Sequence, residues 1–222
     1  MELIPPTPRT FENFVVGRNG ELVHHLRAAL EPSAGERFIY LWGSPGSGKS
    51  HLLEAFAARG RALGQRALRL GAVGFDEAQV PDDCRLVALD DAEALADDAA
   101  QTALFNVYNG LRERGGALVA SGGAAPGQLG LRPELATRLG WGLVYQVHAL
   151  SDEEKMEALG RRAHEHGWPL PHEVAGYLMR HASRDLPFLL GIVEALDRYS
   201  RETKRPITVP LLREILPSTA QE

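Results

Sequence analysis

The stretch from Gly43 to Ser50 constrains the fold of this chain more than any other part of its sequence. It reads Gly-Ser-Pro-Gly-Ser-Gly-Lys-Ser and matches the pattern G-x-x-x-x-G-K-[ST], whose backbone wraps around phosphate groups. The apolar run before it, residues 37–42, predicts a buried strand, and residues 51–59 after it are rich in helix formers. A strand, a glycine turn and a helix N-terminus form an anion site, because backbone N–H groups and the helix dipole point at the phosphates.

We expect the loop and the first residues of its helix to bind a nucleotide. Lys49 should reach the β- and γ-phosphates, and the Ser50 hydroxyl should coordinate Mg²⁺. A chance match in a glycine-rich loop is the alternative, and the flanking strand and helix argue against it. The nucleotide-binding residues predicted in this stretch are Ser44, Pro45, Gly46, Ser47, Gly48, Lys49, Ser50 and His51.

A second apolar segment, residues 85–91, ends in the neighbouring carboxylates Asp90 and Asp91. This is the form of a Walker B strand, whose acidic end lies beside the phosphate loop. We predict that Asp90 holds the Mg²⁺ shell, through Ser50 or through water, and that Asp91 orients the attacking water. An acidic turn after a strand would look the same, and the phosphate loop upstream favours the functional interpretation.

The segments around these motifs alternate between strands and helices. Helices are expected near 19–30 and 99–114, and a short one around Leu131, Leu135 and Leu139; Asn19 is a candidate N-cap. Such alternation predicts a parallel five-stranded sheet covered by helices on both faces. The remaining strands are expected at 66–70, 116–121 and 143–150.

The pattern changes at Ser151, where Ser151 and Glu154 have the spacing of a capping box. The segments that follow are helical only, punctuated by prolines, at 151–166, 171–182, 185–202 and 208–216. Three prolines in the first ten residues predict an extended arm. We therefore expect an N-terminal arm (1–10), an α/β nucleotide-binding domain (11–150) and a small helical domain (151–222).

Composition narrows the classes of function. The net charge of −5 lacks the basic surplus of a dedicated nucleic-acid binder. A single cysteine, Cys84, excludes an internal disulfide and a cysteine-based zinc cage. Because no apolar run is long enough to span a membrane and the N-terminus lacks the apolar core of a signal peptide, we expect a soluble, cytoplasmic protein. His164 and His166 would not share a helix face, so no metal site is predicted there.

The phosphate loop, the Asp90–Asp91 strand and the helical tail, together with the further stretches named below, resemble the AAA+ family. Within that family, the resemblance is to the DnaA/Hda group. The resemblance runs from about Thr10 to Leu216. The stretches that resemble DnaA are 10–19 (Thr-Phe-Glu-Asn-Phe-Val-Val-Gly-Arg-Asn), 138–143 (Arg-Leu-Gly-Trp-Gly-Leu) and 150–155 (Leu-Ser-Asp-Glu-Glu-Lys), and those that resemble Hda-like members are 40–42, 50–53, 104–109 and 128–129.

The resemblance implies a regulator rather than a bulk ATPase. DnaA carries a DNA-binding domain after its lid, whereas this sequence stops at Glu222, so we expect an Hda-like protein. Such proteins bind ADP or ATP with Mg²⁺, dock on the DNA-loaded sliding clamp and promote hydrolysis of the ATP held by DnaA, which prevents re-initiation of replication. Contact with DNA would be only indirect, a homo-oligomer is expected, and no membrane is involved. Arg138 is carried over as an arginine finger for a neighbouring subunit's γ-phosphate.

The resemblance also places an adenine pocket. The apolar turn Val15, Val16 and Gly17 would wall the adenine ring, although on pattern alone ordinary core packing is favoured for it. Pro187 from the lid would complete the pocket.

Three departures from the family pattern bear on activity. Gly123 stands where the family places an acidic sensor residue, and Pro187 stands where it places the sensor-two arginine, with Arg184 one turn earlier as a candidate substitute. Both losses predict weak or absent intrinsic hydrolysis. The third is Glu2-Leu3-Ile4, which lies where the family carries its clamp-binding peptide but lacks the glutamine.

Two other classes of function stay open at the level of sequence. One is an AAA+ adaptor or helicase loader that grips single-stranded DNA, which the acidic net charge disfavours because phosphate contacts need clustered Lys and Arg. The other is a small-molecule P-loop kinase, which would need an arginine-rich lid over a second substrate. Residues 151–216 predict a four-helix tail instead.

Overall fold

In the computed structural model, which describes residues 8–33, 35–95, 97–182 and 185–215, the chain divides at Leu150 into two units. The first spans Arg9–Ala149 and holds every strand of the described chain. The second begins at Leu150 and is helical.

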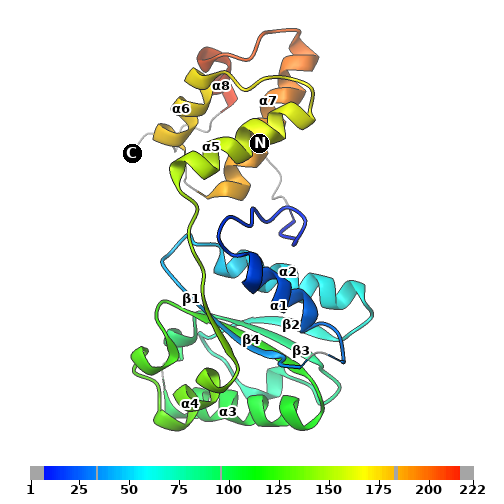
Figure 1. Ribbon diagram of the computed structural model, residues 1–222, viewed down its shortest axis with the longest axis vertical. Helices are drawn as coiled ribbons and strands as arrows, with labels where there is room; N and C mark the ends of the chain where they lie inside the picture. The colour runs from blue at the N-terminus through cyan, green and yellow to red at the C-terminus, as the bar shows by residue number, and fades with distance from the viewer. Residues whose placement is uncertain (1–7, 34, 96, 183–184, 216–222) are drawn as a thin grey trace. The chain divides into compact units, whose positions relative to one another are not determined.

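The first unit is built on a five-stranded parallel sheet (Figure 1). The strands lie in the order β2-β3-β4-β1-β5, so β1, β3 and β4 are flanked on both sides. This arrangement confirms the parallel five-stranded sheet predicted from the sequence. The strands are β1 (Phe38–Trp42), β2 (Ala67–Gly71), β3 (Leu86–Asp90), β4 (Ala117–Gly122) and β5 (Leu143–Gln146).

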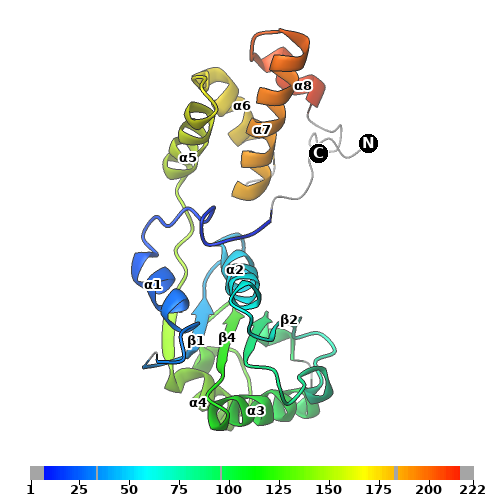
Figure 2. The same ribbon diagram turned by 90° about the vertical axis from the view of Figure 1, so that its right-hand side faces the viewer.

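Helices cover both faces of the sheet (Figures 1 and 2). Successive side chains of a strand point to opposite faces, so Ile39 and Leu41 of β1 pack under α1 and α2, whereas Phe38 and Tyr40 pack against α3 and α4. Because both faces are covered, the central strands are apolar almost throughout. The helices of this unit are α1 (Gly20–Ala28), α2 (Lys49–Ala62), α3 (Asp98–Glu113) and α4 (Pro133–Trp141), with short 3₁₀ turns η1 (Glu77–Gln79), η2 (Ala92–Ala94) and η3 (Pro126–Gln128).

The structure corrects two predictions made from the sequence. The last strand ends at Gln146 instead of reaching residue 150. The next residue, Val147, still donates its N–H to the Trp42 carbonyl of the neighbouring strand (2.7 Å). Asn19 does precede α1, but its side chain makes no capping bond. Its amide instead donates to the carbonyl of His148 (2.9 Å) and accepts from the His148 N–H (2.8 Å). This exchange satisfies a buried amide and attaches the start of α1 to the segment after β5.

The second unit is a four-helix arrangement with its own apolar core. Its first helix begins with the predicted capping box, since Ser151 Oγ accepts from the Glu154 N–H (3.2 Å) and Glu154 Oε2 accepts from the Ser151 N–H (2.7 Å). In the part of the chain that the structure describes, no helix is both long and apolar enough to cross a bilayer. The helices are α5 (Asp152–Glu165), α6 (His172–His181), α7 (Leu186–Thr203) and α8 (Val209–Ile215).

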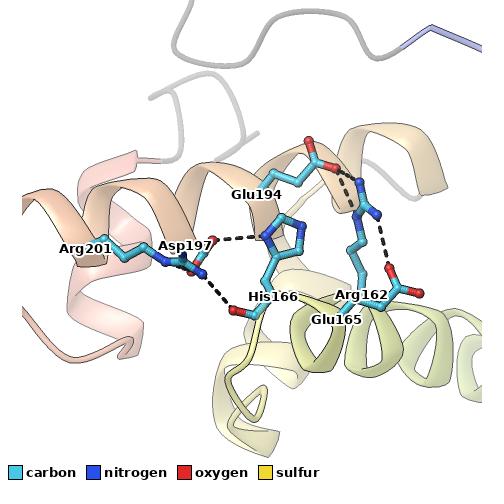
Figure 3. A network of polar contacts seen from close by, with 6 residues as sticks. All are labelled: Arg162, Glu165, His166, Glu194, Asp197 and Arg201. Atoms are coloured by element: carbon cyan, nitrogen blue, oxygen red, sulfur yellow. Dashed lines mark hydrogen bonds and ion pairs between the residues drawn. The ribbon is translucent and has the colours of Figure 1, made fainter.

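Polar contacts join α5 and α7 at the edge of this core (Figure 3). Arg162 of α5 donates to Glu194 of α7. One turn further along α7, Asp197 is only 8% exposed and accepts from Arg201 Nε (2.9 Å). His166 Nδ1 lies 3.1 Å from the same carboxylate. A buried carboxylate with two partners is costly to disturb, because its partners would lose their acceptor together.

Replacing Asp197 with alanine is therefore expected to destabilise the helical unit by about 1–3 kcal/mol. Urea unfolding followed by far-ultraviolet circular dichroism would measure the loss. Glu202→Ala, which removes an exposed carboxylate from the same helix, is the matched control and should change stability far less. Equal effects of the two substitutions would contradict a structural role for the Asp197 contacts.

Candidate functional site

The predicted phosphate loop connects the end of β1 to the start of α2. Gly46 (φ 75°) and Gly48 (φ 106°) adopt left-handed backbone conformations that other residues rarely take. A Cβ at Gly48 would also lie 2.9 Å from Cε2 of Phe14, so the Phe14 ring packs directly on the loop. The glycines therefore allow both the turn of the backbone and its close contact with the preceding segment.

The polar groups of the loop fit a bound phosphate. Lys49 is 9% exposed, and its Nζ donates to the carbonyls of Gly43 (2.8 Å) and Ser44 (3.3 Å). The hydroxyl of Ser47 is buried and has no hydrogen-bond partner among the described residues. A buried hydroxyl without a partner is unfavourable, and an oxyanion in the loop would accept its hydrogen bond. The residues present thus provide the donors that a phosphate group needs.

Asp90 lies at the end of β3 with its side chain nearly buried. Its Oδ1 accepts from the Ser121 hydroxyl (2.6 Å), and its Oδ2 accepts from Nη2 of Arg69 (2.7 Å). The sequence did not identify Arg69 or Ser121 as part of the site. Both contacts depend on the pairing of strands. Arg69 on β2 is opposite Ala88, so it lies diagonally across from Asp90 on the same face of the sheet.

Asp91 follows the strand in a left-handed conformation (φ 56°, ψ 56°), which aspartate tolerates better than most residues. Its N–H donates to the Ser121 hydroxyl (3.2 Å). Burial raises the pKa of the Asp91 carboxyl, and the neighbouring charges of Asp90 and Glu93 raise it further, whereas Lys49 and Arg69 oppose the shift. A raised pKa suits a group that accepts a proton from water, which is the role predicted for Asp91.

The oxygen atoms at this edge are of the kind that Mg²⁺ prefers. Ser50 contributes a hydroxyl in the first turn of α2, and Asp90 contributes a carboxylate at the end of β3. No group of three or more His, Cys, Asp or Glu side chains in the described ranges is placed to hold a metal ion by itself. Mg²⁺ at nucleotide sites commonly takes one or two protein ligands and completes its shell with phosphate oxygens and water.

The turn predicted to wall an adenine ring lies just before α1. Val16 and Gly17 are exposed, Val15 is half-buried, and the turn is closed by a bond from the Asn19 N–H to the Val16 carbonyl (2.8 Å). The ring of His51 links the segment before this turn to the phosphate loop. Its Nε2 lies 2.8 Å from the Thr10 carbonyl, and its ring is 5.3 Å from the Phe14 ring.

The other positions that the sequence analysis named are outside the phosphate loop and the end of β3. Pro187 lies in the first turn of α7, in the other unit. Gly123 follows β4, and its N–H donates to Oε1 of Glu93 (2.8 Å). Arg184 and the stretch from Glu2 to Ile4 lie outside the described residues.

Arg138 lies on α4 beside two aromatic rings. Its guanidinium carbon is 4.1 Å from the ring centre of Trp141 and 5.4 Å from that of Phe105. Trp141 is itself 59% exposed. Stacking on aromatic faces holds a guanidinium by its plane and leaves its N–H groups free to meet an anion.

Two family models match the chain, one on each unit. The model described as the bacterial DnaA ATPase domain matches residues 7–73, which include the phosphate loop. The model described as the Hda lid domain matches residues 152–216, the helical segment. The chain belongs to the DnaA/Hda group of AAA+ proteins. This membership confirms the resemblance inferred from the sequence.

Solved structures of AAA+ proteins share the fold. Domain III of the replication initiation protein DnaA from Thermotoga maritima gives a TM-score of 0.74 at 22% identity, over 98% of this chain and 100% of that one. AMPPCP-bound DnaA from Aquifex aeolicus gives 0.70 at 24% identity, over 90% and 71%. The RuvB Holliday junction branch migration motor of Thermotoga maritima gives 0.62 at 15% identity, over 96% and 72%. The AAA+ architecture predicted from the sequence, an α/β unit followed by a helical lid, is therefore confirmed.

Proposed function

We propose that this DnaA-related AAA+ protein is an Hda-like regulator of replication initiation. In this proposal it binds ADP or ATP, associates with the DNA-loaded sliding clamp and promotes hydrolysis of the ATP bound to DnaA, which prevents re-initiation. The observation that carries the proposal is the match of the helical unit to the Hda lid domain over residues 152–216.

The phosphate loop supports the nucleotide-binding part of the proposal. Lys49 and Ser47 would donate hydrogen bonds to the phosphates, together with the first N–H groups of α2. Mg²⁺ would be held by Ser50 and Asp90, and when bound it neutralises charge on the phosphates. An adenine nucleotide is the expected ligand, because the similar DnaA of Aquifex aeolicus is solved with AMPPCP. The turn at Val15–Gly17 would line the adenine ring.

Arg138 supports the regulatory part of the proposal. A guanidinium at the surface of one subunit can stabilise the charge that develops on the γ-phosphate of a neighbour. The proposal therefore includes association with DnaA and with further copies of this chain. Asp91 would orient water, but Gly123 and Pro187 at the sensor positions predict that the chain's own hydrolysis is weak or absent.

Single-turnover hydrolysis of ATP pre-bound to DnaA tests the proposal. The reaction is followed with and without this protein, and with the clamp either loaded on DNA or omitted. We expect acceleration that requires both the protein and the loaded clamp. Nucleotide binding without any acceleration would contradict the regulatory role, and salt-dependent binding to single-stranded oligonucleotides would then favour an adaptor that grips DNA.

A further inference from the structure

The Asp90 carboxylate is paired with a guanidinium that the nucleotide-binding motifs do not include. Arg69 Nη2 lies 2.7 Å from Asp90 Oδ2, and the Asp90 side chain is 10% exposed. Arg69 itself lies on β2, an outer strand of the sheet, with about a third of its side chain exposed (35%). The contact is therefore a charged hydrogen bond to a nearly buried carboxylate, which is stronger than an ion pair between two exposed side chains.

The same carboxylate is expected to hold the shell of Mg²⁺. Asp90 has lone pairs left for a second cation, because a carboxylate accepts at about four positions and two are used here. Arg69 and Ser121 therefore leave acceptor positions on the carboxylate for a metal ion. The negative charge of Asp90 is nevertheless already balanced by Arg69. A divalent cation that approaches the carboxylate also approaches the guanidinium, which repels it.

The second carboxylate that pairs with Arg69 does not remove this conflict. Glu54 of α2 also forms an ion pair with Arg69, but its Oε2 lies 3.6 Å from Arg69 Nε, farther than Asp90, and it pairs with Arg61 at 3.0 Å. Glu54 therefore does not draw Arg69 away from Asp90.

We propose that Arg69 competes with Mg²⁺ for the Asp90 carboxylate and so reduces the dependence of nucleotide binding on magnesium. Arg69 is a positioning residue in this inference, because it acts through Asp90 and not on the nucleotide. The inference rests on the proposed nucleotide site and is independent of any action on DnaA. It predicts a protein that retains nucleotide when magnesium is scarce.

The test is the affinity for ADP of the full chain, measured by isothermal titration calorimetry in excess Mg²⁺ and in excess EDTA. The quantity compared is a ratio, the Kd for ADP measured in EDTA divided by the Kd measured in Mg²⁺. In Arg69→Met this ratio is expected to rise about tenfold above that of the wild type, as the loss of one charged hydrogen bond implies. Arg69→Gln, which can still donate to Asp90 but carries no charge, should also raise the ratio.

Arg66→Met is the matched control. Arg66 directly precedes β2 and pairs with Asp83, and it has no contact with Asp90 or Glu54 in the described chain, so its removal should leave the ratio unchanged. Circular dichroism spectra should show that all variants are folded. An unchanged ratio in both Arg69 variants would overturn the inference. Failure of the wild type to bind ADP in either buffer would instead contradict the nucleotide site itself, and the inference would fall with it.

Discussion

Replacing Arg138 with alanine is expected to abolish the stimulation of DnaA-bound ATP hydrolysis while leaving the chain's own nucleotide affinity unchanged. An arginine supplied by a neighbouring subunit stabilises charge in the transition state, and such residues contribute about 10³–10⁵ in rate. Nucleotide affinity should be unaffected, because Arg138 lies on α4 against Phe105 and Trp141 and not in the phosphate loop.

The measurement is the single-turnover rate of DnaA-bound ATP in the presence of the loaded clamp. Arg132→Ala is the matched control, since Arg132 precedes the same helix and donates to Thr102 of its own chain (2.9 Å). It should retain most of the stimulation. Arg138→Lys should fail as alanine does, because an ammonium lacks the planar fork that pairs with two oxygens and stacks on Trp141. Full stimulation by Arg138→Ala would remove Arg138 from the mechanism.

Local sequence patterns were sufficient to predict most of the fold. The phosphate loop predicts a strand before it and a helix after it, and the alternation of apolar segments predicts the rest of the sheet. The capping box at Ser151 and Glu154 was also predictable, because its hydrogen bonds join residues three positions apart. These features depend on neighbours along the chain, which a sequence shows directly.

Contacts between distant segments were harder to predict. Asn19 has the residue type and position of a cap, yet its side-chain amide hydrogen-bonds the backbone of His148, which is 129 residues away in the sequence. Arg69 and Asp90 meet only because β2 and β3 pair in one register, and a shift by one residue would place Arg69 on the other face. A motif therefore predicted that Asp90 ends a strand, as the structure shows, but gave no information about the partner of its carboxylate. In the inference proposed above, that partner decides how much negative charge remains for a metal ion.

Lys49→Met is expected to remove the stabilisation of the protein by nucleotide. At one hundred times its Kd, a ligand that binds only the folded state adds about 2.7 kcal/mol, which corresponds to a rise in Tm of about 5–10 °C for a chain of this size. The wild type should show this rise with ADP and Mg²⁺. The variant should show none, because the proposed site relies on the Lys49 ammonium, which lies against the Gly43 and Ser44 carbonyls of the loop, as its main positive charge for the phosphates.

The comparison is made within each variant, with and without nucleotide, since the substitution also removes the hydrogen bonds from Lys49 to the carbonyls of Gly43 and Ser44. A change in the melting temperature of the free protein therefore does not enter the result. Lys204→Met serves as the control, because Lys204 is an exposed lysine that follows α7. It should keep the full rise. If Lys49→Met kept it as well, ADP would bind elsewhere, and the Gly43–Ser50 loop would lose the role that both its conformation and its buried polar groups suggest.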